Sequence, residues 1–339
     1  MSETTEGRSA VGRIRGRKRG LAIAVGGTFW VWLLARWASH NTLLDWLLTA
    51  LGLPNLVRSE RGVSQRDPWL PVEWLRGVAD DITASAAGGA LDGALAEQLV
   101  WPVELVILAS ESEPALAAGA FVTVYLTVAS MFFGLFIAVP TAVTRVYGGS
   151  ISSRLSLAYT ELIRGTPLLA QLFFFYFGLP LAGLISDVPF MELDGMPRSA
   201  AIVAIVAFTI NSGAYQAEYI RSALQSVDPG QLTAARAIGL SRIEGIRHVV
   251  LPQGLRYAIP GWTNEFVYLL KYSSLAAFIT VPELFRRARN IGSDTFQFTD
   301  IYLIVGLLYL ALVITTALLM SRLETRVTIP GVGQSAGRE

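Results

Sequence analysis

The residues of this chain that could do chemistry are charged groups set inside apolar sequence. Glu265 and Lys271 lie within the apolar stretch Ala258–Pro282, and Lys271 is one of only two lysines in the chain. Charges within a bilayer are costly, so both are candidates for a solute pathway or gate. They are six residues apart, which at about 3.6 residues per turn places them on different faces of a helix. Each therefore needs a partner on another segment, or water. A structural ion pair between helices is the alternative reading.

Uncharged polar residues in the apolar segments add hydrogen-bonding groups to these charges. A lining of this kind suits a zwitterionic solute better than a lipid. Ser and Asn in membrane helices also join one helix to another, so a packing role is the alternative for each. The residues concerned are Asn211, Ser212, Asn264, Ser273 and Ser274.

The composition argues against several other chemistries. The chain has no Cys, and its only two His, His40 and His248, give no convincing metal site. Neither lysine stands in a Gly-x-x-x-x-Gly-Lys-Ser/Thr nucleotide-binding loop, so any ATP must bind another chain. A net charge of +1 gives no reason to expect nucleic-acid binding. We therefore expect no metal or cofactor on this chain.

Long apolar segments must position the polar residues. Hydrophobic residues make up 53% of the chain and charged residues 16%, whereas an average soluble domain has about 25% charged residues. A membrane helix needs about 20 mostly apolar residues. Six segments qualify and predict an all-α integral membrane protein with six transmembrane helices: Gly20–Trp37, Gly119–Val143, Pro167–Ser186, Ala200–Ile220, Ala258–Pro282 and Ile301–Met320.

The distribution of charge predicts the orientation of these segments. Residues 1–19 carry six basic and two acidic residues, whereas 39–118 carry four Arg against eleven acidic residues. Because positive loops stay in the cytoplasm, both termini are expected to be cytoplasmic, in a cell (plasma or inner) membrane. Arg286, Arg287 and Arg289 are an exception on the outer side. The first apolar segment lacks a small-residue cleavage pattern, so we expect a retained helix rather than a signal peptide.

This pattern predicts five parts in the chain. The apolar runs Leu43–Leu53 and Leu99–Ala109 are too short to span a bilayer, so they are expected to be interfacial or packing helices of a surface-lying insertion. The parts are a basic cytoplasmic tail (1–19), an extra transmembrane helix (20–37), an extracytoplasmic insertion (38–118), a transmembrane core (119–325) and a cytoplasmic tail (326–339).

The loop between the fourth and fifth segments has strong local signals. Asp228-Pro229-Gly230 is typical of a turn, and Gln231–Ile238 is rich in helix formers. Gly239 predicts a helix stop, and Ser241 with Glu244 predicts a capping box at the next helix. Leu251-Pro252 is expected to end that second helix. The sequence thus predicts two short helices joined by a tight turn.

This loop resembles the signature of importer-type ATP-binding-cassette (ABC) permeases, Glu-Ala-Ala-x3-Gly-x9-Ile-x-Leu-Pro. The sequence departs from it at Thr233, where the family usually has Glu, and has Val249 in place of Ile. The resemblance implies that the first short helix docks in a groove on the ATPase subunit. The departure puts one polar contact in doubt. The residues implied in coupling are Gly230, Gln231, Thr233, Ala234, Ala235, Gly239, Leu251 and Pro252.

Further stretches resemble the polar amino-acid branch of these permeases, over roughly 119–325. They are Tyr159–Leu169 with Gln171, Tyr215–Arg221, Asn264–Phe266 with Leu270–Leu275, and Pro282–Leu284. Together with the polar residues above, they predict a pathway or gate formed by Thr166, Pro167, Gln171, Asn211, Tyr215, Asn264, Glu265, Lys271, Ser273 and Ser274.

The resemblance implies a transport subunit that is not itself an enzyme. An extracytoplasmic binding protein would deliver the amino acid. ATP and Mg would act on partner ATPase subunits, and a second permease, the same or a homologous chain, would complete the membrane pathway. The alternatives are an ABC permease for another small polar solute, an ion-coupled secondary transporter, and a membrane scaffold that keeps the docking loop but moves nothing.

Overall fold

The computed structural model describes residues 20, 24–38, 71–89, 91–179, 181–186 and 199–327, and the regular structure in these ranges is helical. The predicted N-terminal tail at 1–19, residues 328–339 of the predicted C-terminal tail at 326–339, and residues 39–70 of the insertion lie outside the described residues. The chain divides into two units, Met1–Ala118 and Gly119–Glu339.

The first unit contains a helix over 24–38, α3 (Glu73–Ala87) and the beginning of α4 (Gly93–Tyr147). Arg36 Nη2 lies 2.8 Å from Glu113 Oε2, and Trp37 Nε1 donates a 2.7 Å hydrogen bond to the Ala117 carbonyl. These two contacts hold the 24–38 helix against α4.

The end of the predicted insertion and the second predicted segment are continuous in one long helix, although the two compact units divide at the predicted boundary between Ala118 and Gly119. The run Leu99–Ala109 and the segment Gly119–Val143 both lie within α4, which is 55 residues long. Between Gly93 and Gly119 the sequence has no glycine and is rich in Ala, Leu and Glu, which favour a helix. At about 1.5 Å per residue the helix is far longer than a bilayer core of roughly 30 Å.

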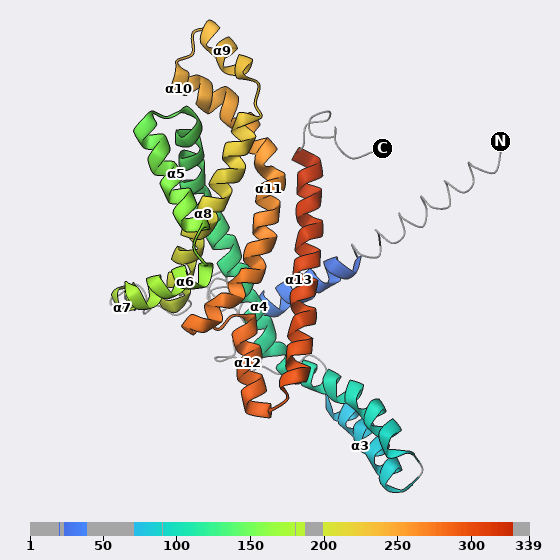
Figure 1. Cartoon of the computed structure of the whole chain (residues 1–339). Coiled ribbons are helices and arrows are strands. Elements are labelled where there is room, and N and C mark those ends of the chain that lie inside the picture. Colours follow the sequence, from blue (N-terminus) through green and yellow to red (C-terminus); the bar gives the residue numbers. More distant parts are fainter. Residues whose placement is uncertain are drawn as a thin grey trace, which may run out of the picture. The chain divides into compact units, whose positions relative to one another are not determined.

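The second unit is a packed group of helices that includes α4 from Gly119 onward (Figure 1). In this unit α9 and α10 lie at one end and α12 at the other. Its further elements are α5 (Ser150–Arg164), α6 (Leu168–Phe173), η2 (Phe174–Gly178), α7 (Leu181–Ser186), α8 (Ser199–Gln225), α9 (Pro229–Ala237), α10 (Arg242–Gly245), η4 (Ile246–Val250), α11 (Leu251–Tyr272), η5 (Ser273–Ile279), α12 (Leu284–Thr295) and α13 (Phe298–Val327).

Helix α8 forms the centre of this unit and packs against α5, α6 and α11. Small side chains on α8 are fully buried and allow neighbouring backbones to approach closely: Ala204, Ala207, Ser212 and Ala214. Trp262 Nε1 donates to Gln216 Oε1 at 2.8 Å, and Ser212 Oγ donates to the Ser130 carbonyl at 3.2 Å. These bonds join α4, α8 and α11.

The contact between α4 and α8 has no room for a side chain at Gly134. A Cβ atom there would lie 2.5 Å from Gln216 Nε2 and 2.7 Å from Ser212 Oγ. Gly134→Ala is therefore expected to destabilise the purified chain by about 1–3 kcal/mol, a typical cost of overpacking. Thermal unfolding in detergent would measure this. Gly306→Ala is the matched control, because a Cβ there meets nothing within 4 Å; equal melting temperatures for the two variants would contradict the packing described.

Three of the described helices, α4, α8 and α13, have the length and apolar composition needed to cross a membrane. The fourth and sixth predicted segments, Ala200–Ile220 and Ile301–Met320, lie within α8 and α13. Residues 24–37 of the first segment are helical. The structure therefore confirms an all-helical membrane architecture for the described residues.

The third and fifth predicted segments are not single helices. The run Pro167–Ser186 is interrupted after Gly178, beside Pro180, because glycine and proline disfavour helix continuation. In Ala258–Pro282, α11 ends at Tyr272 and the chain continues as the 3-10 helix η5. The hydroxyl groups of Ser273 and Ser274 donate hydrogen bonds to carbonyls of the preceding turn. These bonds compete with the regular backbone hydrogen bonds of an α-helix.

The loop between α8 and α11 confirms the predicted turn chemistry but not the predicted end of its second helix. Gly239 has φ +95°, and Ser241 with Glu244 forms a reciprocal capping box. Hydrogen bonding by the Ser241 side chain and backbone lowers the pKa of the Glu244 carboxyl. However, α10 continues through the π-helical η4 directly into α11, so Pro252 does not stop it. Pro252 occupies the first turn of α11, where a missing N–H donor is tolerated.

Candidate functional site

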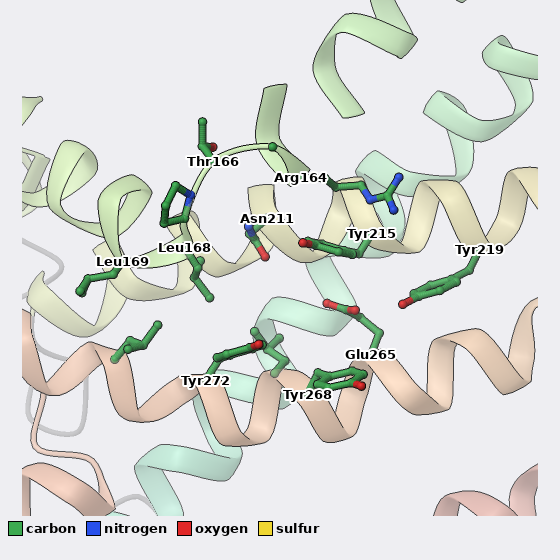
Figure 2. A pocket seen from close by; sticks show the side chains of 14 residues that line it. Arg164, Thr166, Leu168, Leu169, Asn211, Tyr215, Tyr219, Glu265, Tyr268 and Tyr272 are labelled. Atoms are coloured by element: carbon green, nitrogen blue, oxygen red, sulfur yellow. The ribbon is translucent and has the colours of Figure 1, made fainter. Parts of the chain in front are cut away.

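A cavity of about 630 Å³ opens between the α5–α6 connection, α8, α11 and η5 (Figure 2). It lies wholly within the second unit. Its lining combines one cation, one carboxylate, one amide, several tyrosines and several leucines: Arg164, Gly165, Thr166, Pro167, Leu168, Leu169, Asn211, Tyr215, Tyr219, Glu265, Tyr268, Leu269, Tyr272 and Leu275.

Helical spacing brings the lining residues onto facing surfaces. On α8, the residues Asn211, Tyr215 and Tyr219 recur every four positions and therefore share one face. On α11, Glu265 with Tyr268 and Tyr272 recur at three- and four-residue spacing. Figure 2 shows these two sets of side chains facing one another across the cavity.

The charged groups of the cavity come from different elements. Arg164 ends α5, and its guanidinium carbon lies 5.2 Å from the centre of the Tyr215 ring. Glu265 comes from α11 and is only 6% exposed. Among the described residues no hydrogen bond or ion pair engages the Glu265 carboxylate. The cavity therefore holds a carboxylate that is free to bind a cationic group.

Behind Arg164 lies an ion cluster that involves α4, α5 and α8. Glu218 is at its centre: its carboxylate lies 2.9 Å from Arg221 Nε, 3.8 Å from Arg145 Nη1 and 3.9 Å from Arg164 Nη1. Glu218 is shared among three arginines, and Arg221 is the closest of them. The cluster therefore orients Arg164 without fully neutralising its charge. The Arg164 side chain also lines the cavity.

Gln171 holds the break between α5 and α6 in shape. Its Nε2 group donates to the Ile163 carbonyl at 2.6 Å and to Thr166 Oγ1 at 2.8 Å. Its Oε1 accepts a 3.0 Å hydrogen bond from Asn211 Nδ2. The Gln171 side chain is nearly fully buried, so these bonds fasten the loop that carries Arg164 to α8.

Gln171→Leu is expected to destabilise the chain by about 1–3 kcal/mol, because it leaves buried carbonyl and amide groups without partners. Thermal unfolding of the purified chain would measure the change. Ser274→Ala is the control, since that hydroxyl bonds only within its own helix turn, to the Lys271 carbonyl. If the two variants unfolded at the same temperature, the Gln171 network would not be what holds the loop.

The structure brings together half of the residues predicted for the pathway. Thr166, Pro167, Asn211, Tyr215 and Glu265 line the cavity, and Gln171 stands directly behind it.

The other predicted pathway residues lie elsewhere. Asn264 and Lys271 are exposed, and Lys271 Nζ lies 4.6 Å from the centre of the Tyr268 ring. The hydroxyl groups of Ser273 and Ser274 bond within their own helix turn. None of these four residues lines the cavity.

Sequence reasoning did not select Arg164, Tyr219, Tyr268 or Tyr272. Arg164 precedes the third predicted segment, Pro167–Ser186, and the sequence did not predict the interruption of the helix beside it. A signal for the tyrosines was present. Tyr215 with Tyr219, and Tyr268 with Tyr272, each stand four residues apart and so share a helix face with Asn211 and Glu265 respectively.

The residues predicted for coupling gather in and beside α9. Ala235 is 3% exposed and, with Leu232, packs against Gly245 of α10. Gly230, Gln231, Thr233 and Ala234 are exposed on α9, whereas Leu251 and Pro252 form the start of α11. Arg242 Nη2 donates to the Tyr147 carbonyl at 3.1 Å and so ties this region to the end of α4. In the described residues no cluster of His, Asp and Glu could hold a metal ion.

Comparison with known proteins decides the family. A family model described as "Binding-protein-dependent transport system inner membrane component" matches residues 99–329. The chain belongs to this family. It is a multi-pass membrane protein and a permease subunit of an ABC importer, and the predicted membership of the polar amino-acid branch is confirmed.

Individual relatives are similar over most of their length. The glutamine transport system permease protein GlnP of Escherichia coli (strain K12) is 38% identical over 216 residues, which cover 64% of this chain and 94% of GlnP. The L-cystine transport system permease protein TcyB of Bacillus subtilis (strain 168) is 32% identical over 249 residues, 73% of this chain and 96% of TcyB.

Solved structures show the same fold. The structure of an amino acid ABC transporter with histidines matches with a TM-score of 0.54 and 32% identity, covering 63% of this chain and 94% of that one. An inward-facing MetNI methionine ABC transporter also matches with a TM-score of 0.54, but at 23% identity this likeness concerns the fold alone.

Proposed function

We propose that this permease forms the membrane pathway for a polar amino acid, and that the cavity beside Arg164 and Glu265 binds the amino acid during transport. The observation that carries the proposal is the presence of one cation and one unengaged carboxylate in a single cavity. A free amino acid carries both opposite charges. The names of the glutamine and L-cystine permeases similar to this chain support the same solute class.

Each charge of the cavity has a defined task in this proposal. Arginine presents a planar fork of donors that matches a carboxylate, so Arg164 binds the α-carboxylate of the solute. Glu265 accepts hydrogen bonds from the α-ammonium group. The tyrosine walls shield both pairs from bulk water, which strengthens them. Arg164 and Glu265 do not neutralise each other, because no ion pair within the described residues joins them.

We propose that the chain crosses the membrane six times. The boundaries of these crossings differ from those of the six segments predicted from the sequence. The third crossing is formed by α5, α6 and η2 together, which follow one another from Ser150 to Gly178 with a break between Arg164 and Leu168. The break at Arg164–Pro167 then lies within the membrane. Irregular backbone is tolerated at that depth where it lines a cavity, as it does here. The remaining crossings use the 24–38 helix, α4, α8, α11 and α13, with both termini cytoplasmic.

Helix α9 is the proposed contact with the ATPase. Ile238 and Ile243 are 81% and 77% exposed on either side of the Gly239 turn, and Arg236 and Arg242 flank them. A short helix that presents small and apolar side chains suits insertion into a groove of a partner. Thr233 stands where the family usually has Glu, so this complex lacks one polar contact.

The proposed mechanism is alternating access. A loaded extracytoplasmic binding protein docks on the outer face of a pair of permease subunits, the same chain twice or two homologous chains, embedded in membrane lipid. ATP and Mg bind the partner ATPases, whose closure displaces α9. Because α10 continues into α11, which carries Glu265, the displacement reaches one wall of the cavity.

ATP hydrolysis tests this function. The chain is reconstituted in liposomes with its candidate ATPase, and hydrolysis is measured with and without amino-acid-loaded binding protein. We expect stimulation by the loaded binding protein that disappears when 231–238 is deleted. A stable complex without stimulation would favour a scaffold instead. Failure to form any complex would contradict the proposal.

A further inference from the structure

We infer that the amino acid bound in the cavity has a side chain without net charge. The inference rests on the proposed function and follows from the balance of charge in the cavity wall. Among its 14 lining residues, Arg164 is the only basic and Glu265 the only acidic side chain. The α-carboxylate and the α-ammonium of one amino acid engage both. No lining charge is then left to pair with a third charge on the solute.

Neighbouring charges do not fill this gap. Glu218 lies outside the lining and already has Arg221 at 2.9 Å and Arg145 at 3.8 Å. Lys271 also lies outside the lining and is exposed, with its Nζ over the ring of Tyr268. A cationic or anionic side chain in the cavity would therefore lose water without gaining a partner, which is strongly unfavourable.

The rest of the wall suits a neutral side chain. In Figure 2, Leu168 and Leu169 lie away from Arg164 and Glu265, so a solute anchored by its α-groups directs its side chain toward leucines. The amide of Asn211 stands between the two ends. The Nδ2 group of Asn211 is bonded to Gln171, which leaves the Asn211 carbonyl oxygen as an acceptor. The wall thus accepts an apolar stem with a neutral polar end, such as an amide.

Direct binding to the permease–ATPase complex tests the inference, because transport assays also report the selectivity of the binding protein. The complex is purified in detergent without binding protein, and displacement of radiolabelled L-glutamine is measured with L-arginine, L-lysine and L-glutamate. We expect each charged competitor to bind at least about tenfold more weakly than glutamine. A charged amino acid that binds equally or more tightly overturns the inference but not the proposed function. Absence of binding by every amino acid overturns both.

A charge added to the wall gives a second, independent readout. Leu169→Glu places a carboxylate at the apolar end of the cavity, and we expect it to raise the affinity for arginine and lysine at least about tenfold relative to glutamine. Leu162→Glu is the control, since Leu162 is 66% exposed on α5 and does not line the cavity. If both variants left the preference unchanged, the cavity would not set the charge of the side chain, and the inference would be wrong.

Discussion

Glu265→Gln is expected to weaken amino-acid binding to the permease–ATPase complex by about 10- to 100-fold. The substitution keeps the shape of the side chain but removes the charge that we assign to the α-ammonium group. A hydrogen bond to a charged partner contributes roughly 1.5–3 kcal/mol, which corresponds to that range. Equilibrium binding of radiolabelled glutamine measures the loss directly.

The same substitution is not expected to destabilise the fold. Glu265 is 6% exposed and makes no ion pair with the described residues, so its burial is a cost to the folded chain. Thermal unfolding of the variant should occur at the same or a higher temperature. A loss of binding accompanied by a large loss of stability would indicate a structural role for Glu265 instead.

Asn264→Ala provides the control for this prediction. Asn264 is the neighbouring residue on α11, is exposed and does not line the cavity. The Asn264→Ala variant should bind glutamine with the same affinity as the unchanged chain. If Glu265→Gln bound as tightly as Asn264→Ala, recognition of the ammonium group by Glu265 would be refuted.

Ala237→Trp is expected to weaken the complex with the ATPase by about 30-fold or more. Ala235 faces α10, and Ala237 lies about 200° further around α9, so it points away from the rest of the chain. A bulky ring there prevents close approach to a groove, and interference at the centre of an interface costs at least about 2 kcal/mol. Titration of the ATPase onto immobilised permease in detergent measures the affinity.

Asp294→Trp is the control for added bulk. Asp294 is exposed on α12, at the opposite end of the second unit from α9. The Asp294→Trp variant should bind the ATPase with the same affinity as the unchanged chain. Equal affinities for the two variants would exclude α9 as the principal contact.

The coupling region was predictable because its signals are local. The turn at Gly239 and the capping box of Ser241 and Glu244 each depend on a few adjacent residues, and the structure has both. The error concerned Pro252, which was expected to end a helix. The π-helical turn Ile246–Val250 precedes it, so proline occupies a first turn where it needs no donor.

The cavity was predictable only in part because it depends on contacts between distant segments. The apolar sequence around Glu265 and Asn211 identified the first as a costly charge and the second as a polar residue in an apolar segment. Arg164 was missed because the break after α5 is stabilised by Gln171 and Asn211, and nothing local in the sequence reveals that α8 supplies one of these partners. Lys271 does not line the cavity, because a position in the middle of a segment does not determine which face a residue occupies.

Accumulation of glutamine in proteoliposomes tests the central claim most directly. The chain is reconstituted with its ATPase, with ATP inside and loaded binding protein outside, so that transport must draw on hydrolysis. The account predicts uptake that requires ATP, is lost on deletion of 231–238, and persists when an ionophore collapses all ion gradients. Uptake that proceeds without ATP and stops with the ionophore would contradict the account and identify an ion-coupled carrier.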